Sequence, residues 1–306
     1  MNHFCEQSME VKTDHIPVLS KEVLESLKLK PGAVIVDCTF GLGGHAKLIA
    51  QEVAPSGRII GIDRDEESLS LSREQLSAFG CGVDLFHNDF RNIRKILEKL
   101  SIPGVDGFLF DLGLSSFQLD NPARGFSFNS DGPLDMRLDQ ESQISAYDLV
   151  NSLSERELSS IIKNFGQERW HNRIAHSLVT QRSKHPIEST QELKEIILRS
   201  IPLSYHRQKI HPATRTFQAI RIAVNRELEA LAATLSEVMD YLKIGGRVCV
   251  ISFHSLEDKI VKEKFRSFAK EKRIQMITKK PLRPTQEEIV VNSRCRSARL
   301  RVAEKI

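Results

Sequence analysis

Short apolar runs recur along the chain and predict the buried strands of one sheet. The runs are residues 33–40, 58–63, 83–86, 105–112 and 247–252. The first of them, AVIVDCTF, is a nearly continuous stretch of apolar and β-branched residues, which is typical of a strand buried on both faces. Helical patterns separate the early runs. Alternating strands and helices predict an α/β fold with a parallel sheet.

A helical pattern precedes the last of these runs. From Phe217 to Leu242, apolar residues follow one another at spacings of three and four, and Gly245-Gly246 comes next. This spacing predicts one long amphipathic helix, with the two glycines at its end.

The middle of the chain contains no strand-like run. Ser154 and Ser189 are each followed, three residues later, by a glutamate that completes a capping-box signature, and periodic apolar residues come after both. We therefore expect a helical insertion, residues 137–213, that divides the sheet domain into residues 1–136 and 214–306.

Composition excludes several other classes of protein. The chain has 306 residues, of which 40% are hydrophobic and 27% charged, as in a soluble globular protein rather than a disordered or collagen-like one. Its five cysteines are scattered and form no Cys-x-x-Cys pair, which indicates reduced thiols without a zinc site. Its N-terminal segment holds several acidic residues and no apolar stretch. We expect a cytoplasmic protein with no membrane partner and no bound metal.

Charge is distributed unevenly along the chain. Residues 243–306 contain 17 Lys and Arg against 7 Asp and Glu, whereas the rest of the chain is net acidic and the whole carries +4. A basic segment of this kind is suited to the phosphates of a nucleic acid. The alternative is a solvated and partly salt-bridged surface.

The loop after the first predicted strand is rich in glycine. Gly41, Gly43 and Ala46 satisfy the pattern G-x-G-x-x-[GA] at the start of a helical segment, and Asp63 follows Gly41 by 22 residues. Glycines allow a sharp turn and a close approach of a ligand to the N–H groups of the helix. The pattern fits two classes of cofactor, a nicotinamide dinucleotide and S-adenosylmethionine.

An acidic residue before the glycines favours the second class. Asp37 precedes Gly41 by four positions, where it would repel a pyrophosphate. S-adenosylmethionine carries an ammonium group, a sulfonium and a ribose, so Asp37 beside the amino-acid end and Asp63 beside the ribose suit it. Asn88-Asp89-Phe90 and Asp111 end two further strands, and ligands of open α/β sheets bind at such carboxyl ends. The alternative role of each aspartate is a turn or helix cap.

Longer motifs carry a family resemblance. They are residues 15–19 (HIPVL), 37–45 (DCTFGLGGH), 111–119 (DLGLSSFQL), 124–128 (RGFSF), 131–137 (DGPLDMR), 211–219 (HPATRTFQA), 252–258 (SFHSLED) and 296–301 (RSARLR). With these motifs the chain resembles, from about His15 to its C-terminus, the RsmH (MraW) family of 16S ribosomal RNA cytosine-N4 methyltransferases. Motifs of this length are far more specific than a glycine loop.

The resemblance implies a class I S-adenosylmethionine-dependent methyltransferase, with a Rossmann-like sheet and an inserted all-helical domain for RNA recognition. The implied reaction is methylation of N4 of a cytosine in the decoding region of 16S rRNA in the small (30S) ribosomal subunit. By position in the motifs, the implied cofactor contacts are Gly43, Gly44, His45, Asp63, Phe90, Asp111 and Gln118. The strand-end argument adds Asp37 to this set.

Methylation of an exocyclic amine requires an acceptor for the amine hydrogen, because the lone pair of cytosine N4 is delocalised into the ring. Many amino-methyltransferases use an (Asp/Asn/Ser)-Pro-Pro-(Tyr/Phe) motif after the fourth strand. This chain has residues 111–116, DLGLSS, at that place. We hypothesise that this loop supplies the acceptor, with Asp111 and Ser115 as the candidate catalytic residues.

Substrate-binding candidates lie in the motifs beyond this loop. They are Phe126, Phe128, Asp135, Arg137, Arg215 and His254. The phenylalanines, with Phe117 as a third, are suited to stacking on an RNA base, and the alternative is ordinary packing. The aspartate and arginine pair suits the base edge and a phosphate, and the alternative is a structural ion pair. His254 follows the end of a predicted strand, where it would face a substrate; the alternative is a hydrogen-bonded structural residue.

Two other functions stay open at this point. An NAD(P)-dependent oxidoreductase would share the glycine pattern and Asp63, but it would leave Asp37 and the basic segment unexplained. A non-catalytic RNA-binding factor of ribosome assembly would bind the subunit without methyl transfer. The chain is compatible with a monomer or a homodimer, and the role of residues 1–14 is open.

Overall fold

The computed structural model describes residues 17–73, 75–207 and 209–306. Residues 1–14, the first two residues of the motif at 15–19, and Cys5 therefore lie outside the described residues. Within the described part of the chain, no helix is both long enough and apolar enough to cross a membrane.

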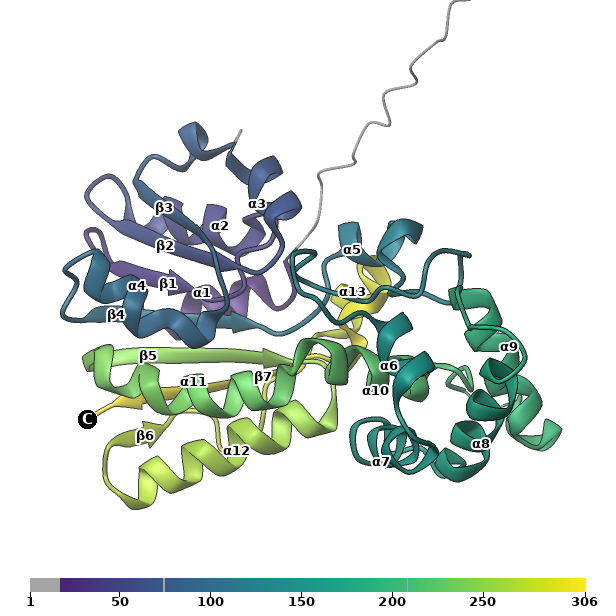
Figure 1. Ribbon diagram of the computed structural model, residues 1–306. Helices are drawn as coiled ribbons and strands as arrows, with labels where there is room; N and C mark the ends of the chain where they lie inside the picture. Colours follow the sequence, from purple (N-terminus) through teal and green to yellow (C-terminus); the bar gives the residue numbers. More distant parts are fainter. Residues whose placement is uncertain (1–16, 74, 208) are drawn as a thin grey trace, which may run out of the picture.

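Seven strands form one sheet in the described part of the chain, in the order β3-β2-β1-β4-β5-β7-β6 (Figure 1). They are β1 (Val34–Asp37), β2 (Arg58–Asp63), β3 (Gly82–His87), β4 (Val105–Asp111), β5 (Leu242–Ser252), β6 (Ile274–Met276) and β7 (Arg299–Lys305). Strands β1 to β5 run parallel, whereas β7 is antiparallel to both β5 and β6. The five expected strands and the class I methyltransferase fold are confirmed.

Helices cover both faces of the sheet. One face is covered by α1 (Ser20–Leu27), α2 (Gly44–Val53) and α3 (Glu66–Arg73), with α13 (Gln286–Val291) at its edge. The other is covered by α4 (Ile93–Lys99), α11 (Glu227–Tyr241) and α12 (Ser255–Lys270). Ile35 packs with the first group and its neighbour Val36 with the second, because successive side chains of a strand point to opposite faces. The strands are therefore buried on both sides, as their continuous apolar runs predict.

The remaining helices lie at the carboxyl end of the parallel strands (Figure 1). They are α5 (Ser116–Asp120), α6 (Ala146–Ser152), α7 (Glu155–Gly166), α8 (His171–Arg182), α9 (Thr190–Ser200) and α10 (Thr214–Asn225). The expected capping boxes of Ser154 and Ser189 are confirmed at the starts of α7 and α9. A third apolar cluster is formed by residues of the helices α6, α7, α8, α9 and α10, and it includes Phe126 and Phe217. The limits of the insertion at residues 137–213 stay a prediction, and this cluster extends past them on both sides.

The single long helix expected from Phe217 to Leu242 is wrong. The structure has two helices, α10 and α11, separated at Arg226, whose backbone is left-handed with φ 50°. The amide side chain of Asn225 explains the break, because it donates to the carbonyl of Met136 and accepts from the N–H of Leu138, both at 2.8 Å. The expected end at Gly245-Gly246 is also wrong, because both glycines lie within β5.

Candidate functional site

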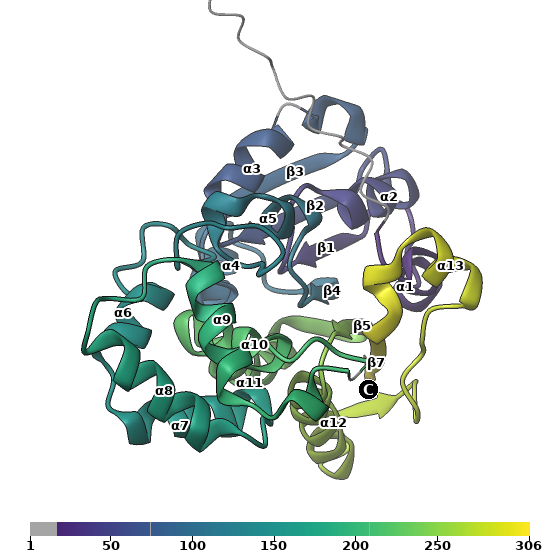
Figure 2. The same ribbon diagram turned by 90° about the vertical axis from the view of Figure 1, so that its right-hand side faces the viewer.

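Three aspartates end neighbouring strands and meet at one edge of the sheet. Asp37 ends β1, Asp63 ends β2 and Asp111 ends β4, and β1 lies between the other two strands. In Figure 2 the molecule is viewed from the side on which α7 to α10 lie, so this edge faces the helical part of the molecule. The three carboxyl groups therefore lie at the end of the sheet nearest the added helices.

Two glycines with left-handed backbone shape the loop between β1 and α2. Gly41 has φ 52° and Gly43 has φ 77°. A Cβ atom on Gly43 would lie only 3.1 Å from the ring of Phe40. Asp63 fixes the loop, because its Oδ2 accepts the N–H of Gly41 at 2.7 Å. The loop conformation therefore explains the glycine pattern. Asp63 has a structural role in the loop in addition to its predicted contact with the ribose of the cofactor.

Burial raises the pKa of two of these aspartates. The pKa of Asp37 rises from 3.8 to about 7 because its carboxylate is removed from water, and the charges of Asp111 and Asp63 add to the shift. His45 acts in the opposite direction. The pKa of Asp63 rises to about 6, again through burial, although backbone N–H groups stabilise its ionised form. Carboxyl groups crowded in this way favour a cationic ligand and disfavour a pyrophosphate.

His45 and Asp111 face each other beside the glycine loop. Nε2 of His45 lies 3.5 Å from Oδ2 of Asp111, an ion-pair distance without a hydrogen bond. Both His45 Nε2 and Asp111 Oδ1 are buried and have no hydrogen-bond partner. Because buried polar atoms normally have partners, these two atoms indicate a place for polar groups of a ligand. An ammonium or hydroxyl group, as S-adenosylmethionine carries, would satisfy the carboxylate.

Ser115 and Gln118 bind each other at the start of α5. Ser115 Oγ accepts the N–H of Gln118 at 3.1 Å, and Gln118 Oε1 accepts the N–H of Ser115 at the same distance. Gln118 Nε2 donates in addition to Asp65 Oδ2 at 2.7 Å. Both residues therefore have a structural role as a capping box. Their roles in catalysis and cofactor binding stay predictions.

A buried ion pair that no local pattern in the sequence predicts lies beside this site. Nη1 of Arg124 lies 2.9 Å from Oδ2 of Asp65, the oxygen that Gln118 also binds. Arg124 is part of the RGFSF motif, but the motif says nothing of a partner 59 residues away. The local sequence offers one indication: Arg124 is followed by two phenylalanines, beside which a guanidinium can be buried.

The two candidate phenylalanines differ in their surroundings. Phe126 is 7% exposed and belongs to the third apolar cluster, with the Arg124 guanidinium 5.8 Å from its ring centre. Phe128 is half-buried and stacks on the exposed ring of His211, with 4.5 Å between ring centres and 20° between ring planes. Phe126 is thus a core residue, whereas Phe128 lies with His211 at the surface.

Asp135 and Arg137 bind each other. Arg137 Nη2 lies 2.6 Å from Asp135 Oδ2, and its Nε is within 3.1 Å of both carboxylate oxygens. Arg137 Nη1 donates to the carbonyls of Gln140 and Ser142. The pair lines a cavity of about 350 Å³. In the structure, Asp135 and Arg137 therefore form an ion pair, as the alternative interpretation expects. Contact of the pair with a base or phosphate stays a prediction.

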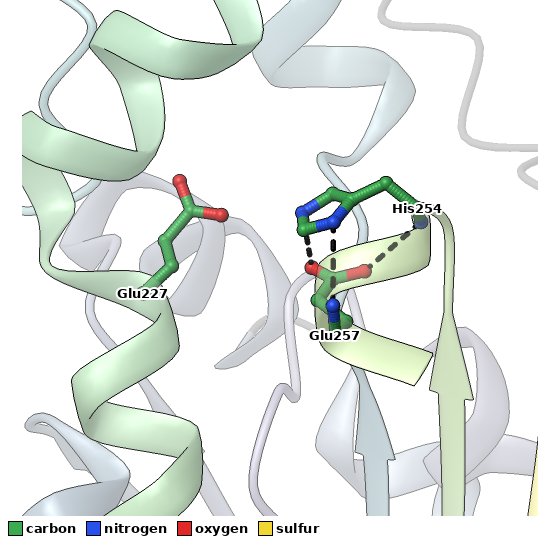
Figure 3. Close-up of side chains that lie close together, drawn as sticks. All are labelled: Glu227, His254 and Glu257. Atoms are coloured by element: carbon green, nitrogen blue, oxygen red, sulfur yellow. Dashed lines mark hydrogen bonds and ion pairs between the residues drawn. The ribbon is translucent and has the colours of Figure 1, made fainter. Parts of the chain in front are cut away.

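His254 lies at the end of β5, where it caps α12. Its Nδ1 accepts the N–H of Glu257 at 3.4 Å, and Glu257 Oε2 accepts the N–H groups of Phe253 and His254. Figure 3 shows the imidazole between the carboxylates of Glu257 and Glu227. Nε2 lies 3.2 Å from Glu257 Oε1 but is buried without a hydrogen bond. The cap holds the ring in one orientation.

This cluster is also the candidate for a metal site in the described part of the chain. Ligand atoms of Glu227, His254 and Glu257 lie within 4.8 Å of one another. Two contacts weigh against a metal ion. Arg221 already donates to both oxygens of Glu227, at 2.9 and 2.8 Å. If Nδ1 of neutral His254 accepts a hydrogen bond, Nε2 carries the proton and cannot be a ligand. The geometry favours a hydrogen-bonded network.

Phe90 and Arg215 occupy different environments. Phe90 is 9% exposed and packs edge-on against Phe110, with 5.7 Å between ring centres. Its predicted contact with an adenine stays a prediction. Arg215 is exposed in the first turn of α10.

One sequence family matches nearly the whole chain. The model of the MraW methylase family covers residues 12–306. The chain is 49% identical to the ribosomal RNA small subunit methyltransferase H of Geobacter sp. (strain M21), covering 95% of this chain and 98% of the relative. Proteins of the same name from Brevibacillus brevis and Clostridioides difficile are 46% and 45% identical, and each match covers 95% of this chain and at least 98% of the relative.

The likeness to solved structures is weaker. An rRNA methylase from Streptococcus thermophilus has a TM-score of 0.43 and 10% identity, covering 94% of this chain and 93% of that chain. A protein of Streptococcus mutans solved in complex with SAH has a TM-score of 0.45 and 12% identity, covering 95% of this chain and 100% of that chain. The sequence relatives are much the stronger likeness.

Proposed function

The chain belongs to the MraW methylase family, and on this basis we propose that it transfers a methyl group from S-adenosylmethionine to N4 of a cytosine in the decoding region of 16S rRNA. Its curated relatives are named ribosomal RNA small subunit methyltransferases. One observation carries the proposal. His45 Nε2 and Asp111 Oδ1 are buried without partners beside a glycine loop, at the edge of the sheet where cofactors of open α/β folds bind.

The site suits S-adenosylmethionine better than a dinucleotide. The proposed contacts are Asp37, Gly43, Gly44, His45, Asp63, Phe90, Asp111 and Gln118. Three of them are carboxyl groups, and burial raises the pKa of two of these, Asp37 and Asp63. A ligand with an ammonium group and a sulfonium would supply positive charge beside them, whereas the pyrophosphate of NAD(P) would add negative charge. This argues against the oxidoreductase alternative.

Asp111 is the stronger of the two candidate acceptors for the amine hydrogen. S-adenosylmethionine supplies an electrophilic methyl group, so the protein must make the N4 lone pair available by accepting a hydrogen from the amine. Oδ1 of Asp111 has no partner, whereas Ser115 Oγ already accepts the N–H of Gln118. Nε2 of His45 lies 3.5 Å from the other carboxylate oxygen, Oδ2.

The cytosine and its RNA would enter from the helical side. Residues 137–213, with Phe128, Asp135, Arg137, Arg215 and His254, are proposed to receive the RNA, and the predicted substrate residue Phe126 would support them from the third apolar cluster. The partner is 16S rRNA in the 30S subunit, which places the enzyme in the cytoplasm with the ribosomes. Either a monomer or a homodimer is compatible with this substrate.

The test is transfer of labelled methyl groups to small subunits from cells that lack this protein, followed by nucleoside analysis of the rRNA. We expect N4-methylcytidine with the wild-type enzyme. Asp111→Asn keeps the size of the side chain but removes its charge, and we expect at least a hundredfold slower transfer. Glu52→Gln, on the exposed side of α2, is the matched control and should transfer normally.

Other results would favour other functions. A label on a different nucleoside would show that the fold is right and the target wrong. Saturable binding of NADH without binding of S-adenosylmethionine would favour the oxidoreductase. Binding to the subunit with no methyl transfer, despite cofactor binding, would favour the assembly factor.

A further inference from the structure

Cations without acidic partners gather in the helical part of the molecule. Arg169, Arg173, Arg207, Lys209 and Arg215 are exposed. Among the described residues, none of them forms an ion pair with a carboxylate. Unpaired cations on one surface leave a positive potential that a polyanion can neutralise.

In the C-terminal segment, where the sequence predicts the basic surface, several arginines have acidic partners within the protein. Arg299 and Arg301 both bind Asp258, and Arg294 binds Asp120. Arg273 binds Asp240, and Arg247 binds Glu304. Part of the positive charge of residues 243–306 is therefore neutralised within the protein, whereas other cations of the segment, such as Arg266, Lys270 and Lys272, are exposed. What distinguishes the helical part is that aromatic rings hold its unpaired cations beside a cavity whose lining contains no acidic residue.

Aromatic rings hold two of the unpaired cations in place. The guanidinium carbon atoms of Arg169 and Arg173 lie 5.3 and 5.4 Å from the ring centre of Trp170. Tyr205 meets Trp170 edge-on, and its hydroxyl oxygen accepts a hydrogen bond from Arg169 Nη1 at 2.7 Å. A stacked guanidinium keeps N–H groups at its edge for a phosphate, and less freedom is lost when the phosphate binds.

A cavity of about 370 Å³ begins beside this cluster. It is lined by Asn172, Arg173, His176, Ser177, Arg199 and Ser200, all donors or cations and none of them acidic. His176 and Arg199 have acidic partners outside the lining, Glu155 and Glu195. Arg173 is thus the cation of the lining that has no acidic partner among the described residues. The lining suits an anion with several acceptor oxygens, such as a phosphate.

The cluster is continuous with the edge that carries the cofactor site. The backbone of Gly166, at the end of α7, packs against the carbonyl of Arg215 in α10. The next residue, Gln167, accepts a hydrogen bond from Ser255 Oγ, beside His254, at 2.9 Å. Figure 2 shows α7 to α10 together on this side of the molecule, near the start of α12. A single-stranded nucleic acid bound from Trp170 to Arg215 would therefore reach the carboxyl end of the sheet.

We propose that Arg169, Trp170, Arg173, Tyr205 and Arg215 form a binding surface for single-stranded RNA that flanks the target cytosine. The arginines bind phosphates, and the rings of Trp170 and Tyr205 hold the guanidinium groups in place for them. The proposal rests on the proposed function for the identity of the polyanion. It goes beyond it by assigning this surface, rather than the basic C-terminal segment, to the RNA.

The test is the affinity of the full chain for a fluorescent single-stranded RNA oligonucleotide, measured by anisotropy at several salt concentrations. In Arg169→Gln/Arg173→Gln we expect binding at least about tenfold weaker and a salt slope smaller by about 1.4, since each phosphate contact contributes about 0.7 on a single strand. Lys262→Gln/Arg266→Gln on α12 changes the same charge in the C-terminal segment and should bind as the wild type does. Trp170→Ala should weaken binding about tenfold, and Tyr205→Phe, which keeps the ring, only slightly.

Three outcomes would overturn the proposal. They are wild-type affinity and salt slope in Arg169→Gln/Arg173→Gln, an equal loss in the α12 control, and no RNA binding by the wild-type protein. Methyl transfer to small subunits is measured separately. If the wild type binds RNA through these residues but transfers no methyl group, the proposed function fails and this surface stands. If transfer occurs and both double variants show an unchanged KM for subunits, the surface fails and the proposed function stands.

Discussion

Arg124 and Asp65 form an ion pair that is almost fully removed from water, with 2.9 Å between Nη1 and Oδ2 and side chains 1% and 2% exposed. Asp65 follows the end of β2, and Arg124 belongs to the segment that leads into the helical part. Arg124 Nη2 also donates to the carbonyls of Arg137 and Leu138. One guanidinium thus joins the edge of the sheet to the start of the helical insertion.

Removing Arg124 should destabilise the protein strongly. In Arg124→Met, the Asp65 carboxylate would stay buried without its counter-ion, and we expect a loss of about 3 to 5 kcal/mol in the free energy of unfolding. Urea unfolding followed by circular dichroism measures it. Arg73→Met is the control, because Arg73 binds Glu66 at the surface, where both side chains are 45% exposed, and should lose under about 1 kcal/mol. Similar losses in the two variants would contradict the prediction.

Asp37 should make stability depend on pH. Its pKa is about 7 in the folded protein against an ordinary value of 3.8. Between these values the folded protein holds a proton that the unfolded chain has released, so the stability contributed by the protonated carboxyl is full below about pH 4 and is lost as pH rises through about 7. Asp37→Asn resembles the protonated form, so its advantage over the wild type should grow with pH, to at most about 4 kcal/mol.

Urea unfolding at pH 5 and pH 8 of both proteins tests this dependence. Glu52→Gln, in which an exposed carboxylate is replaced, should run parallel to the wild type. If Asp37→Asn also runs parallel to the wild type, the carboxyl group of Asp37 does not titrate in this range.

The network around Glu227 should be stable without a metal ion. Arg221 supplies the counter-ion of Glu227, and Glu257 is held by backbone N–H groups. Dialysis against a chelator should leave the unfolding midpoint unchanged. Arg221→Met should cost about 3 kcal/mol or more, because it leaves Glu227 unpaired beside Glu257. Arg226→Met, whose exposed partner is Glu229, is the control with little effect. A stoichiometric metal in the purified protein, with stability lost on chelation, would contradict this account.

Local patterns in the sequence were sufficient for much of the fold. The run AVIVDCTF contains β1, because a strand buried on both faces needs a continuous apolar stretch. Ser154 begins a helix for a reason visible within four residues. The strand ends also brought Asp37, Asp63 and Asp111 together, since parallel strands of one sheet end at the same edge.

Contacts between distant residues could not be predicted in this way. The break at Arg226 depends on Asn225 binding Met136 and Leu138, and the apolar spacing continues through it. Strand β7 was missed because RLRVAEK is rich in charge, and its Arg301 is accommodated only by Asp258, 43 residues away. In both cases the local sequence gives no indication of the distant partner.

The two phenylalanines of the RGFSF motif should respond differently to truncation. Phe126 is packed in the third apolar cluster, so Phe126→Ala should cost about 3 kcal/mol or more in stability. Phe128 lies against the exposed ring of His211 and, if it stacks on a base, Phe128→Ala should slow methyl transfer at least tenfold with a smaller loss of stability. Both quantities are measured on the same preparations, by urea unfolding and by labelled transfer to small subunits. Phe128→Tyr keeps the ring and serves as the control for the stacking role. Transfer at the wild-type rate by Phe128→Ala would show that its ring only packs against His211 and Phe217.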